Sequence, residues 1–361
     1  MSRLRILADD LTGALDSAAQ FVPTEGRIPT VWAPPNTLPW PAAIDAGTRE
    51  LNAKEAAALM RRLAPVLDEA DPSFRKIDSL LRGHVAAEIA TCLRGFAHCV
   101  IAPAFPAQGR VTRAGRQFVA DGEGWREVGP DLAASLRELG LNIVLCRPGD
   151  SAPEGASLWD AEVESDLDLV VAKCRCLPNR VLWCGSAGLA GALAGRAPIP
   201  QPQLRGPILG LVGSDHPASV AQLSAAWSRV RRITRGDAEE AARIARLLAS
   251  NGAVIVAAVM PPGLTRAHAA RHIAGCFTNL LARLDPPGTL LVTGGETLRM
   301  VCVALGAGRL DVDGQLMPGI PTAVLRGGAW DGLRVVSKSG AFGDAGLLAR
   351  LLALPRLGDT A

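Results

Sequence analysis

The sequence predicts an α/β protein of two domains, each built around a mostly parallel sheet, with a cleft between them. Short apolar runs of strand length alternate along the chain with longer amphipathic segments of helical period. Strands that are apolar from end to end and separated by helices are typical of a parallel sheet covered on both faces. The chain has 361 residues, a length that suggests about two domains.

The best candidate for a domain boundary is the segment 195–207, which holds four prolines and two glycines in thirteen residues. Such a segment continues neither a helix nor a central strand. We therefore expect one domain over residues 1–200 and a second over residues 206–361. A cleft between two such domains is a common place for a small-molecule site.

The end of each expected strand matters, because ligands of α/β proteins bind beyond the carboxyl ends of the strands. The expected strands are eight apolar runs: Leu4–Ala8, Cys99–Ala102, Asn142–Cys146, Val181–Cys184, Ile208–Val212, Ala253–Ala258, Thr289–Val292 and Val335–Lys338. Residues 53–70 and 237–250 show the amphipathic pattern of helices.

The composition limits the kinds of partner. A net charge of +3, with Lys and Arg scattered along the chain, does not indicate a nucleic-acid partner. The N-terminus lacks the apolar segment of a signal peptide, and no run approaches the roughly 18 apolar residues of a membrane span, so we expect no membrane partner. The eight cysteines are widely spread without CxxC spacing, so we expect buried free thiols and a cytoplasmic protein. His268 and His272 lack the intervening glutamate of a zinc site, and we assign no metal ligands.

An acidic doublet follows the first expected strand. Asp9 and Asp10 come directly after the apolar run, and Thr12 and Gly13 stand where the next helix begins. Carboxylates at such a position can accept hydrogen bonds from a polyol or act as a general base toward a hydroxyl. The alternative is that one of the two carboxylates only caps the helix.

A second polar stretch, residues 75–89, places Lys76, Asp78, Ser79 and Arg82 within seven positions, just before Gly83. Basic side chains bind a carboxylate and an aspartate binds a hydroxyl, so the stretch suits an acidic, hydroxylated ligand. The alternative is a solvated loop with internal salt bridges. Residues 100–119 then predict a strand that ends in a rigid, proline-containing loop.

The second domain contains three junctions in which a strand, small residues and a helix follow one another. They contain Gly213–Ser214, the quartet from Gly294 to Thr297, and Lys338–Ser339–Gly340. Each exposes backbone N–H groups at a helix N-terminus, where a phosphate is favoured, and glycine lets the phosphate approach closely. None matches the Walker or the dinucleotide fingerprint. The alternative for any single junction is a turn that serves only folding, but together they predict a nucleotide or phosphate site.

Taken in order, these stretches resemble the motifs of the four-carbon acid sugar kinase family, which uses ATP to phosphorylate threonate, erythronate or 3-oxo-tetronate. ILADDLTGALDSA resembles ADDxTGAxD, TRELNAKEA from Thr48 resembles T(E/S)R, and KIDSLLRGHVAAEI resembles KxDSTLRGNxGAE. APAFPAQGRVTRAGRQFV resembles APAFPxxGRTVxxGxxYV, and WCGSAGLAGALA resembles GSAGLAxAL. The three junctions are similar to the nucleotide motifs GS, GG(D/E)T and KSGGFG. The chain departs from the family at Leu80, His84 and Ala341, and its segment after Phe118 lacks the DPxTPMxES stretch.

The resemblance implies a two-domain kinase of carbohydrate metabolism. The first domain binds the acid sugar, the second binds ATP, and the phosphoryl group is transferred to the C4 hydroxyl with Mg²⁺ bridging the phosphates. Asp10 or Asp78 accepts the proton, and Arg82 neutralises charge with Lys76 and Arg49. The implied substrate-binding residues are Asp9, Thr12, Gly13, Arg49, Lys76, Ser79 and Arg110. The implied ATP-binding residues are Ser214, Gly294, Gly295, Glu296, Thr297, Lys338 and Gly340, with Glu296 as the candidate that helps to hold Mg²⁺.

Two rival functions remain. A dehydrogenase or isomerase of sugar acids would require a dinucleotide fingerprint, which is absent from the sequence. A non-catalytic nucleotide-binding or regulatory relative of the family would retain the second domain without turnover. The sequence leaves the oligomeric state open, with a homo-oligomer as one option.

Overall fold

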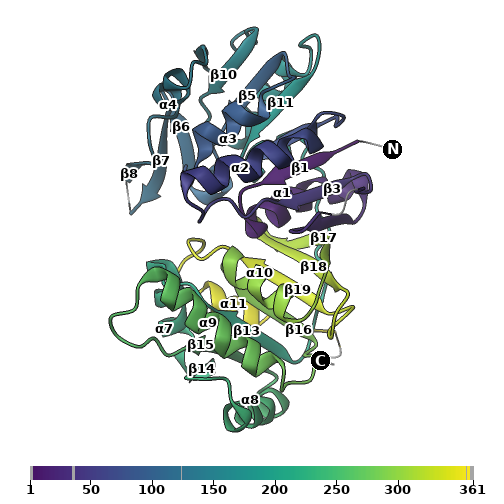
Figure 1. The fold of residues 1–361 in the computed structure, drawn as a ribbon, viewed down its shortest axis with the longest axis vertical. Helices are drawn as coiled ribbons and strands as arrows, with labels where there is room; N and C mark the ends of the chain where they lie inside the picture. Colours follow the sequence, from purple (N-terminus) through teal and green to yellow (C-terminus); the bar gives the residue numbers. More distant parts are fainter. Residues whose placement is uncertain (1–2, 35–36, 123, 355, 358–361) are drawn as a thin grey trace. The chain divides into compact units, whose positions relative to one another are not determined.

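The computed structural model describes residues 3–34, 37–122, 124–354 and 356–357. The chain forms two compact units, which divide between Pro200 and Gln201, inside the proline-rich segment (Figure 1). Each unit is a layered α/β structure, so the expected fold class of mostly parallel α/β sheets is confirmed.

The first unit contains an eight-stranded sheet in the order β2–β3–β1–β4–β11–β5–β10–β9, and all neighbouring strands are parallel. The strands are β1 (Arg5–Ala8), β2 (Ile28–Val31), β3 (Ala42–Asp45), β4 (Ser73–Lys76), β5 (His98–Ala102), β9 (Ile143–Cys146), β10 (Gly155–Trp159) and β11 (Val181–Gly185). The chain runs from β1 to β2 and β3 on one side, then returns to β4 on the other side. The carboxyl ends of β1 and β4 therefore flank a switch point of the sheet, where α/β proteins bind ligands.

Helices cover both faces of this sheet. They are α1 (Leu11–Glu25), α2 (Ala53–Leu63), α3 (Val85–Cys92), α4 (Leu132–Glu138), α5 (Glu164–Cys174) and α6 (Ala187–Leu193). Helices α2, α3 and α4 share one apolar core with the sheet, whereas α6 contacts both α1 and α5. Three further strands, β6 (Arg110–Arg113), β7 (Arg116–Asp121) and β8 (Gly124–Val128), form a small antiparallel sheet.

The second unit has a sheet in the order β14–β15–β13–β16–β19–β18–β17. The first five strands are parallel and the last two are antiparallel to their neighbours. They are β13 (Ile208–Val212), β14 (Val230–Ile233), β15 (Ala253–Ala258), β16 (Thr289–Thr293), β17 (Arg309–Met317), β18 (Ile320–Arg326) and β19 (Arg334–Lys338), while β12 (Leu204–Arg205) pairs separately with β20 (Arg356–Leu357). The chain order places a second switch point between β13 and β16.

The helices of the second unit also form two layers. They are α7 (Pro217–Ala225), α8 (Ala238–Asn251), α9 (Arg266–Leu281), α10 (Gly295–Ala304) and α11 (Leu347–Leu352). Helices α7 and α11 contact each other and pack on one face of the strands, and α9 contacts both α8 and α10. Figure 1 shows α9 and α10 lying in front of the strands.

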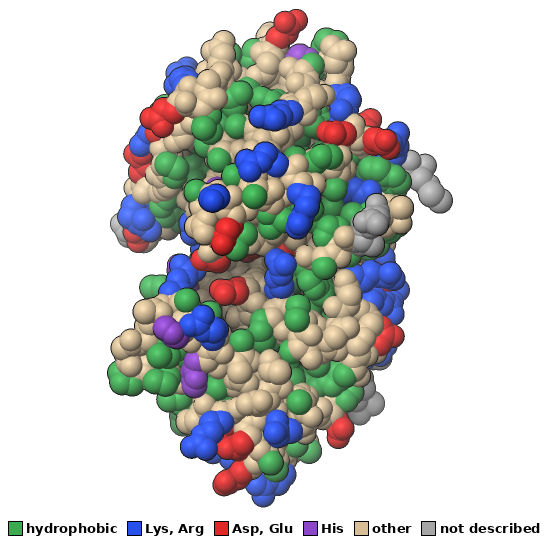
Figure 2. Space-filling view, in the orientation of Figure 1, with side chains coloured by type: hydrophobic (Ala, Val, Ile, Leu, Met, Phe, Trp, Pro, Cys, Tyr) green, Lys and Arg blue, Asp and Glu red, His purple; other side chains and the backbone are tan. Residues whose placement is uncertain are grey.

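All eight expected strands are present, with ends that differ by at most one residue. The expected helix 53–70 stops at Leu63, and a 3₁₀ turn, Ala64–Leu67, follows because Pro65 cannot continue the helical hydrogen bonding. Seven of the eight cysteines are buried, Cys176 is exposed, and none forms a disulfide. Among the described residues, no helix combines the length and the apolar character needed to cross a membrane. On the face drawn in Figure 2, Lys and Arg side chains are scattered over each unit rather than gathered in one patch.

Candidate functional site

The acidic doublet lies at the carboxyl end of β1, where α1 begins. Asp10 is the N-cap of α1, and its Oδ1 accepts a 2.8 Å hydrogen bond from the Gly13 N–H. Asp9 is buried, with 2% of its surface exposed. Capping therefore describes only one of the Asp10 oxygens, because the Oδ2 atoms of both Asp9 and Asp10 contact a cation that follows a different strand.

That cation is Arg49, which follows β3. Its Nε lies 2.7 Å from Asp9 Oδ2, and its Nη1 lies 2.5 Å from Asp10 Oδ2. Its Nη2 lies 3.7 Å from an oxygen of Asp78, which follows β4. One guanidinium thus joins the ends of three adjacent strands.

The loop after β4 is closed by an ion pair. Arg82 donates from Nε and Nη2 to the two Asp78 oxygens at 2.7 and 2.9 Å, and its backbone N–H donates to Oδ2 at 3.1 Å. The Asp78 side chain is 8% exposed and that of Arg82 is 45% exposed. The internal salt bridge that we considered as an alternative is therefore present, and it leaves Arg82 half in solvent.

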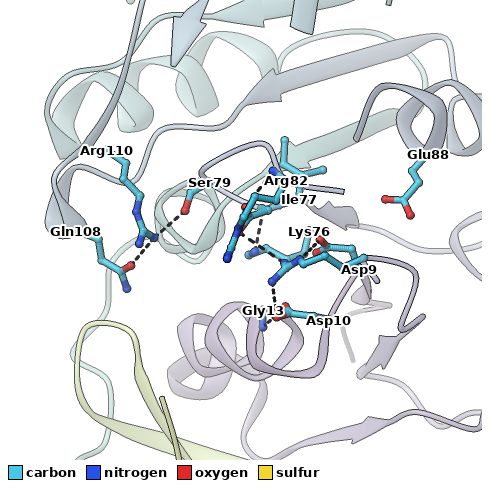
Figure 3. A network of polar contacts seen from close by, with 12 residues as sticks. Asp9, Asp10, Gly13, Lys76, Ile77, Ser79, Arg82, Glu88, Gln108 and Arg110 are labelled. Carbon is cyan, nitrogen blue, oxygen red and sulfur yellow. Dashed lines mark hydrogen bonds and ion pairs between the residues drawn. The ribbon is translucent and has the colours of Figure 1, made fainter. Parts of the chain in front are cut away.

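Lys76 lies against the first turn of α1. Its Nζ donates to the Ile77 carbonyl at 2.7 Å. A methyl group at Gly13 would come within 2.9 Å of Lys76 Nζ and 2.7 Å of Asp10 Oδ1, which is closer than real Cβ contacts. A Cβ at this position would therefore displace the lysine ammonium or the capping carboxylate, and Figure 3 shows the three residues together.

The small antiparallel sheet contributes the last cation of this cluster. Arg110, at the start of β6, donates from Nη1 to Ser79 Oγ at 2.8 Å and to Gln108 Oε1 at 2.7 Å. Gln117 of β7 donates to the Ser79 carbonyl at 2.8 Å. A Cβ at Gly129 would lie 2.7 Å from that of Leu81. The shortened segment after Phe118 thus packs directly on the loop that carries Ser79.

The electrostatic environment separates the three carboxylates. Burial raises the pKa of Asp10, and the charge of Asp9 adds to this, while Arg49 opposes it. Burial also acts to raise the pKa of Asp9, but Arg49 and Lys76 outweigh it and the pKa is lowered. For Asp78, burial is outweighed by Arg49 and Arg82, which hold the pKa well below its usual range. Asp10 is therefore the only one of these three carboxylates whose pKa is raised.

Asp16 is a buried carboxylate that the sequence did not single out. It follows Gly13 by three residues on α1 and therefore lies on the same helix face. Burial raises its pKa to about 6, against the opposing charge of Lys76. Its Oδ1, Thr12 Oγ1 and Ser17 Oγ have no hydrogen-bond partner within the described part of the chain. Such orphaned buried atoms are rare and point to a bound ligand or water. The i, i+3 spacing from Gly13 was the signal that could have identified Asp16.

In the second unit, the three small-residue junctions lie at one edge of the sheet, at the ends of β13, β16 and β19. The Gly294 N–H donates to the Lys338 carbonyl at 2.8 Å. A Cβ at Gly213 would collide with Thr297 Oγ1, and one at Gly340 would collide with Ser214 Oγ. The expected nucleotide residues Ser214, Gly294, Gly295, Thr297 and Gly340 therefore form one cluster.

Among the expected nucleotide-binding residues, Glu296 and Lys338 differ in their exposure to solvent. Glu296, in the first turn of α10, is exposed. Lys338 is fully buried, and its Nζ donates to the carbonyls of Ser339 and Phe342 at 2.7 and 2.9 Å. Burial lowers the pKa of Lys338 to about 7. A direct contact of Lys338 with a nucleotide stays a prediction.

Comparison with known proteins links both clusters to kinases. Residues 4–138 match a family model described as a sugar-binding N-terminal domain, and residues 209–348 match one described as a nucleotide-binding C-terminal domain. The chain is 34% identical to a D-threonate kinase of Cupriavidus necator over 95% of each chain. It is 30% identical to a D-threonate kinase of Bordetella bronchiseptica, over 96% of this chain and 95% of the relative. A 3-oxo-tetronate kinase of Pseudomonas fluorescens is 26% identical, over 97% of this chain and 96% of the relative.

Solved structures share the fold. A protein of Salmonella typhimurium LT2 superposes with a TM-score of 0.74 at 21% identity, covering 96% of this chain and 98% of its own. A Haemophilus influenzae protein superposes with a TM-score of 0.68 at 19% identity, covering 97% of this chain and all of its own.

Because the relatives that align with nearly the whole chain are kinases, the protein is a phosphotransferase. It belongs to the four-carbon acid sugar kinase family, to which its sequence motifs are similar.

Proposed function

We propose that the protein transfers the γ-phosphoryl group of ATP to the C4 hydroxyl of a four-carbon acid sugar, with D-threonate as the first candidate. The observation that carries the proposal is the alignment with a D-threonate kinase over 95% of the chain, because it includes both units. 3-Oxo-tetronate is the second candidate, since more distant relatives are 3-oxo-tetronate kinases. Erythronate is the third, because the resemblance of the sequence motifs implies it. We also propose that the enzyme works in the cytoplasm, where its free cysteines remain reduced.

In this proposal Asp10 is the proton acceptor. The hydroxyl oxygen of the acid sugar attacks the γ-phosphorus, the bond from that phosphorus to the β-phosphate oxygen breaks, and the hydroxyl proton passes to Asp10. The raised pKa of Asp10 supports this role, as does its side-chain exposure of 19%. Asp78 is less suited because Arg49 and Arg82 lower its pKa, which makes it a weak base. Its role is to orient Arg82.

The remaining residues of the first unit bind the acid sugar. The half-exposed Arg82, together with Lys76 and Arg110, supplies positive charge for the substrate carboxylate and for the moving phosphoryl group. Arg49 is committed to the aspartates, so it positions Asp9 and Asp10. The unpartnered Asp9 Oδ1 and Thr12 Oγ1 are available for substrate hydroxyls. Ser79 would add a hydroxyl group held in place by Arg110.

The second unit binds ATP in this proposal. The amides near Ser214, Gly295 and Gly340 suit phosphate oxygens, and Thr297 adds a hydroxyl at the same edge. Gly294 lies in the same cluster, but its own N–H already donates to the Lys338 carbonyl. No group of three or more His, Cys, Asp or Glu side chains able to hold a metal ion occurs in the described ranges. Mg²⁺ in kinases is held by one or two carboxylates together with phosphates and water, so a single carboxylate of the protein would be enough. Mg²⁺ neutralises phosphate charge when bound, and Glu296, which is exposed in the first turn of α10, would help to hold it.

The test is acid-dependent ADP release from the full chain. D-threonate, the erythronates and 3-oxo-tetronates are each offered with ATP and Mg²⁺, and the product is identified by phosphorus NMR. We expect turnover with one four-carbon acid and little with three- or five-carbon acids. Nucleotide binding without turnover on any acid would favour the non-catalytic alternative and contradict the proposal.

A further inference from the structure

The loop of residues 339–344, which follows β19, is held from the inside by three buried side chains. These are Lys338 at the end of β19 and Ser219 and Gln222 on α7, each 0% exposed. They donate hydrogen bonds to five backbone carbonyls of the loop, those of Ser339, Gly340, Phe342, Gly343 and Asp344. Lys338 Nζ donates to Ser339 and Phe342, Ser219 Oγ to Gly340 at 2.8 Å, and Gln222 Nε2 to Phe342, Gly343 and Asp344 at 2.9, 3.0 and 3.0 Å.

These bonds determine which way the peptide groups of the loop face. The loop contains no cis peptide bond, and in a trans peptide the carbonyl and the following N–H point in opposite directions. The carbonyls of Ser339, Gly340 and Phe342 point toward the buried side chains. The N–H groups of Gly340, Ala341 and Gly343 therefore point away from them.

No protein acceptor for these three N–H groups is found in the part of the chain that the structure describes. The loop is half-buried at these residues, so a ligand can reach the amides. Successive free backbone N–H groups form a nest that binds anions. This nest lies against Ser214, because a Cβ at Gly340 would collide with the Ser214 side chain.

We propose that Gln222 and Lys338, assisted by Ser219, are positioning residues that turn the amides of the 339–344 loop toward the phosphates of the nucleotide. The proposal rests on the nucleotide site of the proposed function and refines it. Lys338 acts through the loop carbonyls rather than as a phosphate ligand, since both the ammonium and the stem of this side chain are buried. The proposal adds Gln222 to the residues of the nucleotide site, although Gln222 belongs to none of the motifs expected from the sequence.

The test is nucleotide affinity, measured by calorimetry on the full chain. Gln222→Met keeps the length of the side chain and removes the donor to three carbonyls. We expect the Kd values for ATP and ADP to rise about tenfold, because several hydrogen bonds that orient the loop are lost. The Kd for adenosine, which lacks phosphates, should stay within twofold of the wild-type value, as should KM for the acid sugar.

Ser219→Ala is the milder second variant, and it removes a single hydrogen bond to Gly340. We expect a smaller rise, about threefold, again only for nucleotides with phosphates. This variant serves if Gln222→Met fails to fold. The matched control is Ser224→Ala, at an exposed position of the same helix, which should change none of these constants.

Each outcome bears on the proposal. Unchanged ATP and ADP affinity in Gln222→Met overturns the positioning role, and so does an equal loss of affinity for adenosine. If the wild-type chain binds neither ATP nor ADP, the proposed nucleotide site itself is wrong. The two failures are therefore distinguishable in the same set of titrations.

Discussion

The guanidinium of Arg49 donates a 2.5 Å hydrogen bond to Asp10, although 39 residues separate the two in sequence. The same guanidinium contacts Asp9 and lies 3.7 Å from Asp78. The carboxylates that follow β1 and β4 are therefore organised around one cation that follows β3. This arrangement sets the expected behaviour of variants in the first unit.

Replacing Asp10 with asparagine should remove the proposed proton acceptor while leaving the second unit intact. We expect kcat for acid-sugar phosphorylation to fall by about 10²–10⁴-fold, the usual contribution of general base catalysis. The Kd for ATP, measured by calorimetry, should change less than twofold. A variant with wild-type kcat would exclude Asp10 as the base.

Arg49→Gln should destabilise the protein, because it leaves three carboxylates without their shared cation. Breaking a buried ion pair typically lowers the free energy of unfolding by about 3–5 kcal/mol. Urea denaturation measures this change. Arg126→Gln is the control, since Arg126 pairs with Asp121 at the surface and both side chains are more than 60% exposed. Similar stability losses in the two variants would contradict the role assigned to Arg49.

A methyl group at Gly13 tests the contact between Lys76 and the start of α1. Alanine in place of a helical glycine normally stabilises a protein by about 1 kcal/mol. At Gly13 we expect the opposite sign and a raised KM for the acid sugar, because the new Cβ would lie 2.9 Å from Lys76 Nζ.

The matched control is Gly275→Ala on α9, where no heavy atom lies within 4 Å of the added Cβ. This variant should gain stability and keep both kinetic constants. If Gly13→Ala behaves like Gly275→Ala in thermal unfolding and kinetics, Lys76 does not pack closely against position 13.

Asp16 should give stability a distinct pH dependence. Its pKa is raised from 3.8 to about 6 in the folded protein, so the folded state binds more protons than the unfolded state between these values. The free energy of unfolding contributed by this group therefore falls as pH rises from about 4 to about 6, and stays low above that.

Asp16→Asn removes this ionisation. At pH 7.5 the variant should be more stable than the wild type by about 2–3 kcal/mol, and the gain should shrink toward pH 4. Denaturant titrations at several pH values measure the difference. Asp121→Asn at the surface is the control, and a gain of equal size at pH 4 and pH 7.5 would argue against a buried ionising group.

Glu296→Ala should separate metal-dependent from metal-independent nucleotide binding. We expect the Kd for ATP to rise several-fold in the presence of Mg²⁺ and to stay unchanged when EDTA removes it, because in the proposed site this exposed carboxylate acts through the cation. Equal Kd values for wild type and variant in Mg²⁺ would rule out this placement of Glu296.

The secondary structure of the core could be read from the sequence where a strand is apolar throughout, as in Ile208–Val212 and Ala253–Ala258. The sequence pattern does not predict the strand Ser73–Lys76, because Arg75 and Lys76 interrupt its apolar pattern. This strand is nevertheless central to the first sheet. Arg75 is nevertheless fully buried, and its guanidinium pairs with Glu88 of α3. Only the tertiary partner explains a charged residue in that strand.

The sequence by itself determined the fold class, the proline-rich break between the units and the stretches that carry polar chemistry, because these depend on local pattern. Only the tertiary structure decided which of those residues meet: Arg49 with Asp9 and Asp10, and Gln222 with the 339–344 loop. It also separated the pKa values of neighbouring aspartates, since burial and the charges of distant residues act through space. Local sequence does not show which residues contact one another, because the order of the parallel strands in the sheet differs from their order along the chain.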